Sequence, residues 1–342
     1  MSFSKQLLLW YEEHRRDLPW RGINDPYKIW ASEIILQQTR VNQGWDYYEK
    51  FIDTFPSVSD LANAPIEKVL KVWQGLGYYS RARNMHFTAK QIVEKHNGVF
   101  PSDYEQVLKL KGIGDYTAAA ITSIAFKLPY PAVDGNVMRV VTRIFGIHDD
   151  ISTQKTKKTI TEKCQALMTG NDPGEFNQAM MEFGALQCTP KSPDCETCPF
   201  INFCYAYKNG VIHLLPVKKN TIQIKKRYFH YFVFIHRKQT ILYQRKESDI
   251  WRELFQFPFY ESATETDGYL SELLATYNHS ATSDFHTKHQ LSHQLIHLSF
   301  YIIHTQQLPS LDGTPLIVDI ERIHDYPFPI VIARFVENLV NG

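Results

Sequence analysis

The segment LKLKGIGDYTAAAI, residues 108–121, decides the fold of this chain. Two glycines, Gly112 and Gly114, separate one helical pattern from an alanine-rich one, which predicts helix, tight turn and helix over about 105–125. Such a turn lets backbone N–H groups approach a ligand at the start of the second helix, where the helix dipole favours an anion such as a DNA phosphate. A two-glycine turn is also a common plain connection between packed helices, so both interpretations stay open at this point.

Helical signals surround this segment over residues 2–187 without a convincing strand. Pro26 opens one helical pattern, Ser57 and Pro65 precede two short ones, and Ser102 precedes another. Short breakers rich in Gly, Pro and Asn separate them, which predicts a compact all-α region with short connections. We therefore expect residues 1–208 to form a helical catalytic region.

A different pattern begins further along the chain. Residues 209–227 combine Gly, Pro and several Lys, and aromatic and β-branched segments follow. This change predicts a linker over 209–227 and an α+β domain over 228–342, with helices near GYLSELLATY and PIVIARFVENLV. The chain as a whole is expected to be a multi-domain protein.

Four of the five cysteines, Cys188, Cys195, Cys198 and Cys204, fall within one short loop, 188–204. Thiolates so close together can surround one soft metal centre, a zinc ion or an iron-sulfur cluster. Structural zinc sites with four cysteines usually have two CxxC pairs, and this loop has one, which favours the cluster. Cys164 stands apart on a predicted helix and is expected to be a buried hydrophobic residue.

Composition places few limits on function. The chain has 342 residues, 44% of them hydrophobic, and its 37 Lys and Arg nearly balance 36 Asp and Glu, so net charge gives no case for a nucleic-acid partner. No apolar stretch is long enough to cross a membrane, and the N-terminus shows an amphipathic helix rather than a signal peptide. The expected compartment is the cytoplasm, with association with the nucleoid during work on DNA.

The sequence surroundings of two carboxyl groups make them candidates for a catalytic site. Glu33 lies in IWASEIILQQT, where neighbouring apolar side chains would raise its pKa and favour the protonated acid. Asp134 lies in PAVDGNVMRV at a predicted helix start. One protonated and one ionised carboxyl group would suit cleavage of a glycosidic bond. By themselves, these residues are equally an exposed helix glutamate and an N-cap aspartate.

Several motifs together carry a resemblance to a known family. With the cysteine loop, they resemble the adenine DNA glycosylases of the MutY type, in the endonuclease III or helix-hairpin-helix superfamily, over most of residues 8–208. They are RDLPWR (16–21), SEIILQQTR (32–40), GLGYYSRARN (75–84), GIGDYTA (112–118) and VDGNVMR (133–139). The cysteine loop itself closely resembles the [4Fe-4S] loop of that superfamily.

The resemblance implies a role for each matching residue. Glu33 would be the general acid that protonates adenine, and Asp134 would stabilise the oxocarbenium-like sugar. Tyr116 stands where lyase-type relatives carry the lysine that forms a Schiff base, which implies a monofunctional hydrolase. The implied adenine pocket contains Arg16, Trp20, Arg21, Gln178 and Met181, and the implied DNA or opposite-base contacts are Gln38, Thr39, Leu76, Tyr78, Gly112 and Gly114.

The C-terminal region faintly resembles the Nudix-like domain that MutY-type proteins append. The glutamate-rich Nudix helix that holds Mg²⁺ is absent from the sequence, so we expect recognition without hydrolysis. In the family, a loop with an aromatic, a serine and a histidine reads 8-oxoguanine opposite the adenine. Here Ser292 and His293 match, but Leu291 replaces the aromatic, which puts the packing part of that recognition in doubt.

The expected function is therefore excision of adenine from double-stranded DNA, opposite 8-oxoguanine or guanine, in base excision repair. The expected protein is a monomer with a [4Fe-4S] cluster. Two alternatives remain: a bifunctional endonuclease III-like glycosylase for oxidised pyrimidines, and a non-catalytic iron-sulfur DNA-binding protein. Tyr116 and the additional C-terminal domain disfavour the first, whereas substitution of Glu33 and Asp134 would test the second.

Overall fold

The computed structural model describes residues 1–219, 224–246, 249–265, 268–279 and 283–341. The chain folds into two compact units, Met1–Asn63 with Asn84–Asn220 and Ala64–Arg83 with Thr221–Gly342. The predicted linker 209–227 contains this division, although 220–223 lie outside the described residues. Residues 64–83 group with the C-terminal segment, a placement that the predicted domain boundaries do not include.

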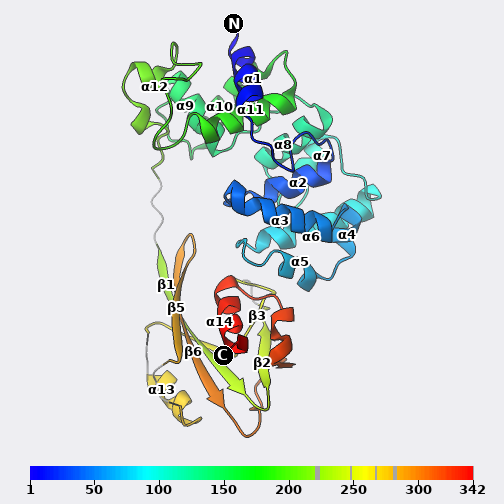
Figure 1. The fold of residues 1–342 in the computed structure, drawn as a ribbon, viewed down its shortest axis with the longest axis vertical. Helices are drawn as coiled ribbons and strands as arrows, with labels where there is room; N and C mark the ends of the chain where they lie inside the picture. The colour runs from blue at the N-terminus through cyan, green and yellow to red at the C-terminus, as the bar shows by residue number, and fades with distance from the viewer. Residues whose placement is uncertain (220–223, 247–248, 266–267, 280–282, 342) are drawn as a thin grey trace. The chain divides into compact units, whose positions relative to one another are not determined.

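The first unit is helical, as the sequence predicted (Figure 1). Its elements are α1 (Phe3–His14), α2 (Pro26–Ile35), α3 (Val41–Thr54), α4 (Val58–Asn63), α6 (Ser80–His96, begun in the second unit), α7 (Tyr104–Leu108), α8 (Asp115–Phe126), α9 (Gly135–Phe145), α10 (Gln154–Met168), α11 (Pro173–Leu186), α12 (Tyr205–Lys208) and the 3₁₀ turn η1 (Ile212–Leu214).

Local signals explain where these helices begin. Asp25 caps α2 and Pro26 takes its first position, as expected from a missing N–H and a fixed φ. Asp103 caps α7, so the predicted start at Ser102 is wrong by one residue; the Asp103 carboxylate accepts the backbone N–H of Gln106 at 3.0 Å. Asp134 caps α9 in the same way, and the N-cap interpretation of this residue is therefore correct.

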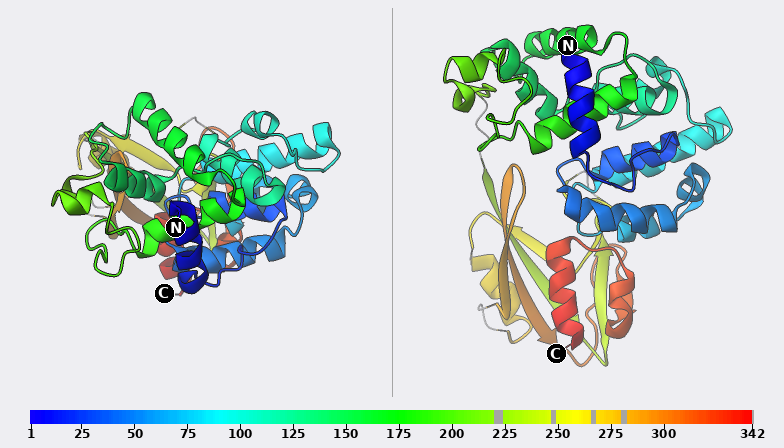
Figure 2. Two further views of the ribbon diagram at one scale, coloured as in Figure 1. Left: turned by 90° about the horizontal axis from the view of Figure 1, so that it is seen from above. Right: turned by 45° about the horizontal axis from the view of Figure 1, so that its top comes forward.

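One core joins α1, α9, α10 and α11 to the cysteine loop. Buried Trp10, Val140, Ile160 and Phe183 belong to this core, and several of the loop's cysteines pack against it. Figures 1 and 2 show α1 crossing α11 within this group. The loop contains little regular secondary structure. Burial of its apolar side chains against the rigid helices therefore holds it in place.

The second unit is α+β. Its elements are α5 (Ile66–Val72), β1 (Lys225–Ile235), β2 (Gln239–Gln244), β3 (Phe255–Gln256), β4 (Phe259–Ser262), α13 (Gly268–Ala275), β5 (Phe285–Gln290), β6 (Gln294–His304), β7 (Leu316–Asp319), η2 (Ile320–Asp325) and α14 (Ile330–Asn341). The main sheet has the order β4-β1-β6-β5, with β1 and β6 parallel, and β3-β2-β7 form a second sheet.

Alternation along the central strands gives the main sheet two apolar faces. On one face, Phe232 of β1 and Tyr301 of β6 pack with Leu270 and Leu274 of α13. On the other face, the ring of Phe300 stacks on that of Phe335 of α14, with 4.0 Å between centroids. The segment QLSHQLIHLSFYII contains the last residue of β5, the turn at 291–293 and most of β6.

Candidate active site

Three helices of the first unit bring together the predicted acid and its neighbours. Glu33 lies on α2, Tyr116 in the first turn of α8 and Met181 on α11. The Tyr116 hydroxyl donates to Glu33 Oε2 at 2.5 Å and also lies 3.2 Å from the Met181 sulfur. Tyr116 is therefore a direct partner of the candidate acid and not only a packing residue beneath the turn.

Asp134 is held by the start of α9. One carboxylate oxygen accepts the backbone N–H of Val137 at 2.8 Å, and the other accepts the side-chain amide of Asn136 at 2.7 Å. Burial raises the pKa values of both Glu33 and Tyr116, and the charge of Asp134 adds to both rises, so the three groups are electrostatically coupled. The two predicted carboxyl groups thus belong to one site.

The electrostatics of the site favour a protonated Glu33. Burial raises the pKa of this carboxyl, while the Tyr116 hydroxyl and the positive charge of Arg21 oppose that rise. Burial also raises the pKa of Asp134, and the two N–H donors on its oxygens oppose this rise. These donors favour the ionised form of Asp134, whereas the groups that favour the ionised form of Glu33 are the Tyr116 hydroxyl and the Arg21 charge.

A buried carboxylate that the sequence did not predict fixes two pocket arginines. Glu182 of α11 is 1% exposed, and its oxygens accept Arg16 Nε at 2.7 Å and Arg21 Nη2 at 3.1 Å. Burial alone would raise the pKa of Glu182, but the Arg16 hydrogen bonds and the Arg21 charge hold it below the usual value. The only sequence signal was a charged residue inside the apolar run MMEFGAL, one helical turn after Gln178.

The other predicted pocket residues have different surroundings. Gln178 accepts a hydrogen bond from the Tyr11 hydroxyl at 3.1 Å, and the Arg21 guanidinium lies 5.8 Å from the centre of the same ring. Trp20 is 7% exposed and packs edge-on against Trp45 and Tyr48, with centroid distances of 6.2 and 5.3 Å. Tyr11 is a second residue that the sequence did not single out.

The predicted helix-hairpin-helix is confirmed as α7, a turn and α8. Gly112 has φ +82°, and a Cβ added there would lie 2.7 Å from Asn84, so glycine is required for conformation and for space. Gly114 precedes the first residue of α8 and faces open space. The first backbone N–H groups of α8 thus stand beside a surface that a phosphate could reach.

The end of α2 leads to residues predicted to contact DNA. Gln37 donates from Nε2 to Thr117 of α8 at 3.5 Å, and the Thr39 hydroxyl donates to the Gln37 carbonyl at 3.4 Å. Gln38 has φ +62°, a left-handed conformation that is uncommon for glutamine. The turn therefore lies beside the helix-hairpin-helix and contains backbone strain of the kind found at binding sites.

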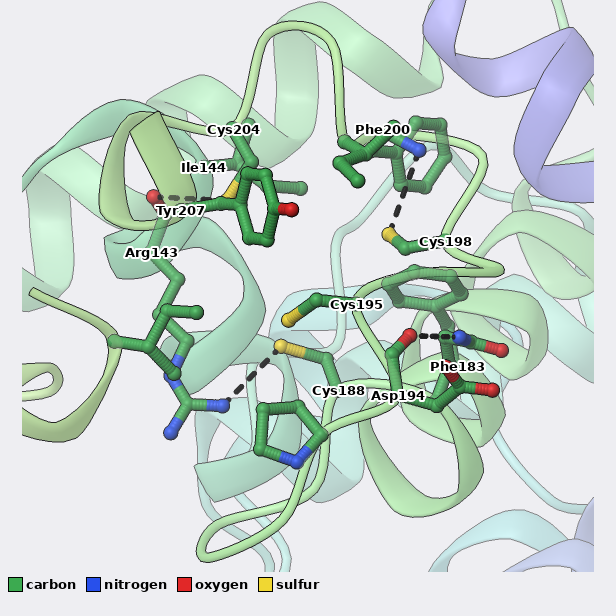
Figure 3. A pocket seen from close by; sticks show the side chains of 14 residues that line it. Arg143, Ile144, Phe183, Cys188, Asp194, Cys195, Cys198, Phe200, Cys204 and Tyr207 are labelled. Atoms are coloured by element: carbon green, nitrogen blue, oxygen red, sulfur yellow. Dashed lines mark hydrogen bonds between the residues drawn. The ribbon is translucent and has the colours of Figure 1, made fainter. Parts of the chain in front are cut away.

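The four loop cysteines surround one pocket, drawn in Figure 3. None of the four is in a disulfide, and the walls include Ile144, Phe183 and Phe200. Within the described parts of the chain, no group of three or more His, Cys, Asp or Glu side chains is placed to hold a single metal ion. Four cysteine sulfurs around one apolar space match the four-thiolate ligand set of an iron-sulfur cluster.

Two arginines of α9 fasten this loop. Arg139 donates to the Cys188 carbonyl at 2.8 Å and to Asn136 at 2.9 Å, which in turn donates to Asp134. Arg143 donates to the Thr189 carbonyl at 2.7 Å and approaches the Cys188 sulfur at 3.4 Å. A bound cluster would supply thiolate-to-iron cross-links that rigidify the loop, and these arginines would hold it against α9.

Four of the residues predicted to contact the opposite base, Leu76, Tyr78, Ser292 and His293, lie in the second unit. Tyr78, 48% exposed and with φ +47°, forms a hydrogen bond with the Ser292 hydroxyl. Ser292 and His293 are the exposed residues of the tight turn between β5 and β6, where Leu291 N–H donates to the Gln294 carbonyl. Leu76 is buried at 8% exposed, so its contacts are within the protein.

Comparison with known proteins defines the class first. Residues 31–166 match the HhH-GPD superfamily of base excision DNA repair proteins, 188–204 match the iron-sulfur binding domain of endonuclease III, and 230–338 match the NUDIX domain. A solved thermostable thymine-DNA glycosylase has a TM-score of 0.56 and 29% identity, covering 60% of this chain and 95% of its own. The chain is a base excision DNA glycosylase with a [4Fe-4S] loop.

Curated relatives then define the family. An adenine DNA glycosylase of Buchnera aphidicola subsp. Baizongia pistaciae is 35% identical over 88% of this chain and 85% of its own length. Another, from Buchnera aphidicola subsp. Schizaphis graminum, is 33% identical over 98% of both chains. The protein belongs to the adenine DNA glycosylase family. In the described part of the chain, every helix is too short or too polar to cross a membrane.

Proposed function

We propose that this protein hydrolyses the N-glycosidic bond of adenine in double-stranded DNA where adenine pairs with 8-oxoguanine or guanine. Glu33 is the general acid and Asp134 stabilises the positive charge on the sugar. The observation that carries the proposal is the coupled trio of Glu33, Tyr116 and Asp134. Burial raises the pKa of both carboxyl groups, but two N–H donors oppose this rise at Asp134, whereas a single phenol hydroxyl donates to Glu33.

The reaction would need adenine outside the duplex. Glu33 then donates its proton to the imidazole nitrogen of the base, which becomes a neutral leaving group as the bond to C1′ breaks. Asp134 faces the sugar as an anion and stabilises the oxocarbenium-like centre. Water then adds to C1′ and loses its proton to the Glu33 carboxylate, which restores the acid. Arg16 and Arg21, held by Glu182, support the pocket for the base.

We infer a monofunctional enzyme from Tyr116. A phenol can donate a hydrogen bond to Glu33 but cannot form the imine that strand cleavage through a Schiff base requires. Borohydride added during turnover should therefore trap no covalent protein-DNA complex. A trapped complex formed in proportion to adenine release would support the bifunctional alternative instead.

The decisive experiment is single-turnover excision from duplexes containing adenine opposite 8-oxoguanine, guanine or thymine. Glu33→Gln and Asp134→Asn should each lower the rate by about 10²- to 10⁴-fold, the range for loss of acid–base assistance. Glu162→Gln, an exposed glutamate on α10, is the control and should react at the wild-type rate. Retention of full activity in both site variants would refute the proposed roles of Glu33 and Asp134, whereas a wild-type protein that binds these duplexes but releases no adenine would support the non-catalytic alternative.

A further inference from the structure

A large cavity lies in the second unit around the Ser292 turn. Its volume is about 710 Å³, and most of its lining comes from the glycine-rich turn with the start of α6, the loop between β2 and β3, and the turn between β5 and β6, with Ile330 of α14 completing it. Both Leu291 and Trp251 are among its lining residues. Drug-sized and base-sized ligands bind in clefts of this size that combine apolar walls with a few polar groups.

Polar groups suited to a base edge line this cavity. Ser292 and His293 come from the turn between β5 and β6, and Gln294 begins β6. Hydrogen-bonding groups give orientation and specificity, but a flat purine also needs an apolar or aromatic surface against which to pack. Leu291, at the position where the resemblance implies an aromatic, does not provide one.

Trp251 supplies an aromatic ring to the same cavity from a different loop. It is 8% exposed, its ring centroid lies 5.9 Å from that of Phe229 in an edge-on arrangement, and 6.0 Å from the ring of His289. Its φ is +61°, which is rare for a bulky side chain and persists only where the surroundings enforce it. The conformation therefore needs support from the neighbouring loop.

That support comes from arginines on both sides of the tryptophan. Arg227 donates to both oxygens of Asp249, at 2.7 and 3.0 Å, and Arg245 donates to the Ile250 carbonyl at 3.1 Å. Arg83 donates to the Arg252 carbonyl at 2.8 Å. Hydrogen bonds from arginine side chains thus fix the residues before and after Trp251. These bonds hold its indole ring at the wall of the cavity.

We propose that Trp251 is the residue against which the base opposite the adenine packs, in place of the aromatic that this chain lacks at position 291. The ligand is a purine, 8-oxoguanine or guanine, while Ser292 reads its edge. This inference rests on the proposed function and names a specificity residue for it. The loop between β2 and β3 supplies the aromatic ring in place of the turn between β5 and β6.

The test is binding to duplexes whose adenosine carries a 2′-fluoro group, which blocks excision. Trp251→Leu should weaken binding opposite 8-oxoguanine by about 5- to 150-fold, the range for loss of one base–aromatic stack. Binding to adenine opposite an abasic site analogue should not change, because no base is present there. Trp251→Phe keeps a ring and should retain most of the affinity.

Leu291→Phe provides a rescue. Added to Trp251→Leu, it should restore much of the affinity opposite 8-oxoguanine, because either position can supply the ring to one cavity. Equal loss on all duplexes, including the abasic one, or no rescue by Leu291→Phe would overturn the inference, as would unchanged binding in Trp251→Leu. If the wild-type enzyme releases no adenine from any duplex, the proposed function itself fails.

Discussion

Removal of the Tyr116 hydroxyl should move the alkaline limb of the pH profile of adenine release to higher pH. This hydroxyl donates to Glu33 at 2.5 Å and stabilises the ionised carboxylate, so it lowers a pKa that burial raises. In Tyr116→Phe, Glu33 loses this donor and holds its proton to higher pH. The alkaline limb of the pH profile, where the acid loses its proton, should therefore move to higher pH.

The size of the displacement follows from the strength of the lost bond. A hydrogen bond to a charged group contributes about 1.5–3 kcal/mol, and one pH unit corresponds to about 1.36 kcal/mol. The alkaline limb should thus move by about one to two pH units. The loss of a polar contact near the sugar also predicts a lower plateau rate at acidic pH.

The assay is single-turnover adenine release across the pH range, from a duplex with adenine opposite 8-oxoguanine. Tyr130→Phe is the matched control, since Tyr130 is 36% exposed and its ring stacks on Tyr104, away from Glu33. Its profile should match that of the wild type. A limb in Tyr116→Phe that stays in place or moves to lower pH would refute the assignment of Glu33 as the acid.

The remaining predictions concern stability. Gly112→Ala should lower the melting temperature and the affinity for DNA more than Gly170→Ala, because both glycines have positive φ but only the first meets a side chain within 4 Å. Glu182→Gln should lower the melting temperature by more than Glu162→Gln, since it removes a charge that is 1% exposed and binds two arginines. Because the folded pKa of Glu33 is raised, its stabilising contribution is complete below about pH 4.3 and is lost as pH rises through the folded pKa. Melting temperatures of Glu33→Gln should therefore fall less from pH 4 to 8 than those of the wild type, and parallel curves would contradict this sign.

Local chemistry explains what could be predicted from the sequence. The glycine turn at 112–114 and the cysteine loop at 188–204 each contain all their determinants within a few residues. Caps behave in the same way, so the start of α2 was predicted correctly and that of α7 was missed by one residue. The loop at 291–293 was expected from the family resemblance and not from a local signal, because Ser-His is a weak turn signal between two strongly alternating segments.

Long-range partners could not be predicted in this way. Glu182 meets Arg16 across 166 positions, and a lone glutamate in a helix gives no sign of which face will be buried. The grouping of residues 64–83 with the C-terminal unit similarly depends on packing between segments far apart in the sequence. The pairing of Trp251 with the Ser292 cavity is a further case, because only folding brings the two loops together.

The candidate site also shows why a glycosylase must place its two carboxyl groups in different surroundings. Two ionised carboxylates close together repel each other, so one retains its proton more readily. Asp134 has donors from a helix start on both oxygens, whereas Glu33 lies among apolar side chains and accepts from one phenol. The helix start thus favours the charge on Asp134, and the proposed mechanism needs this difference because Glu33 must keep its proton while Asp134 is ionised.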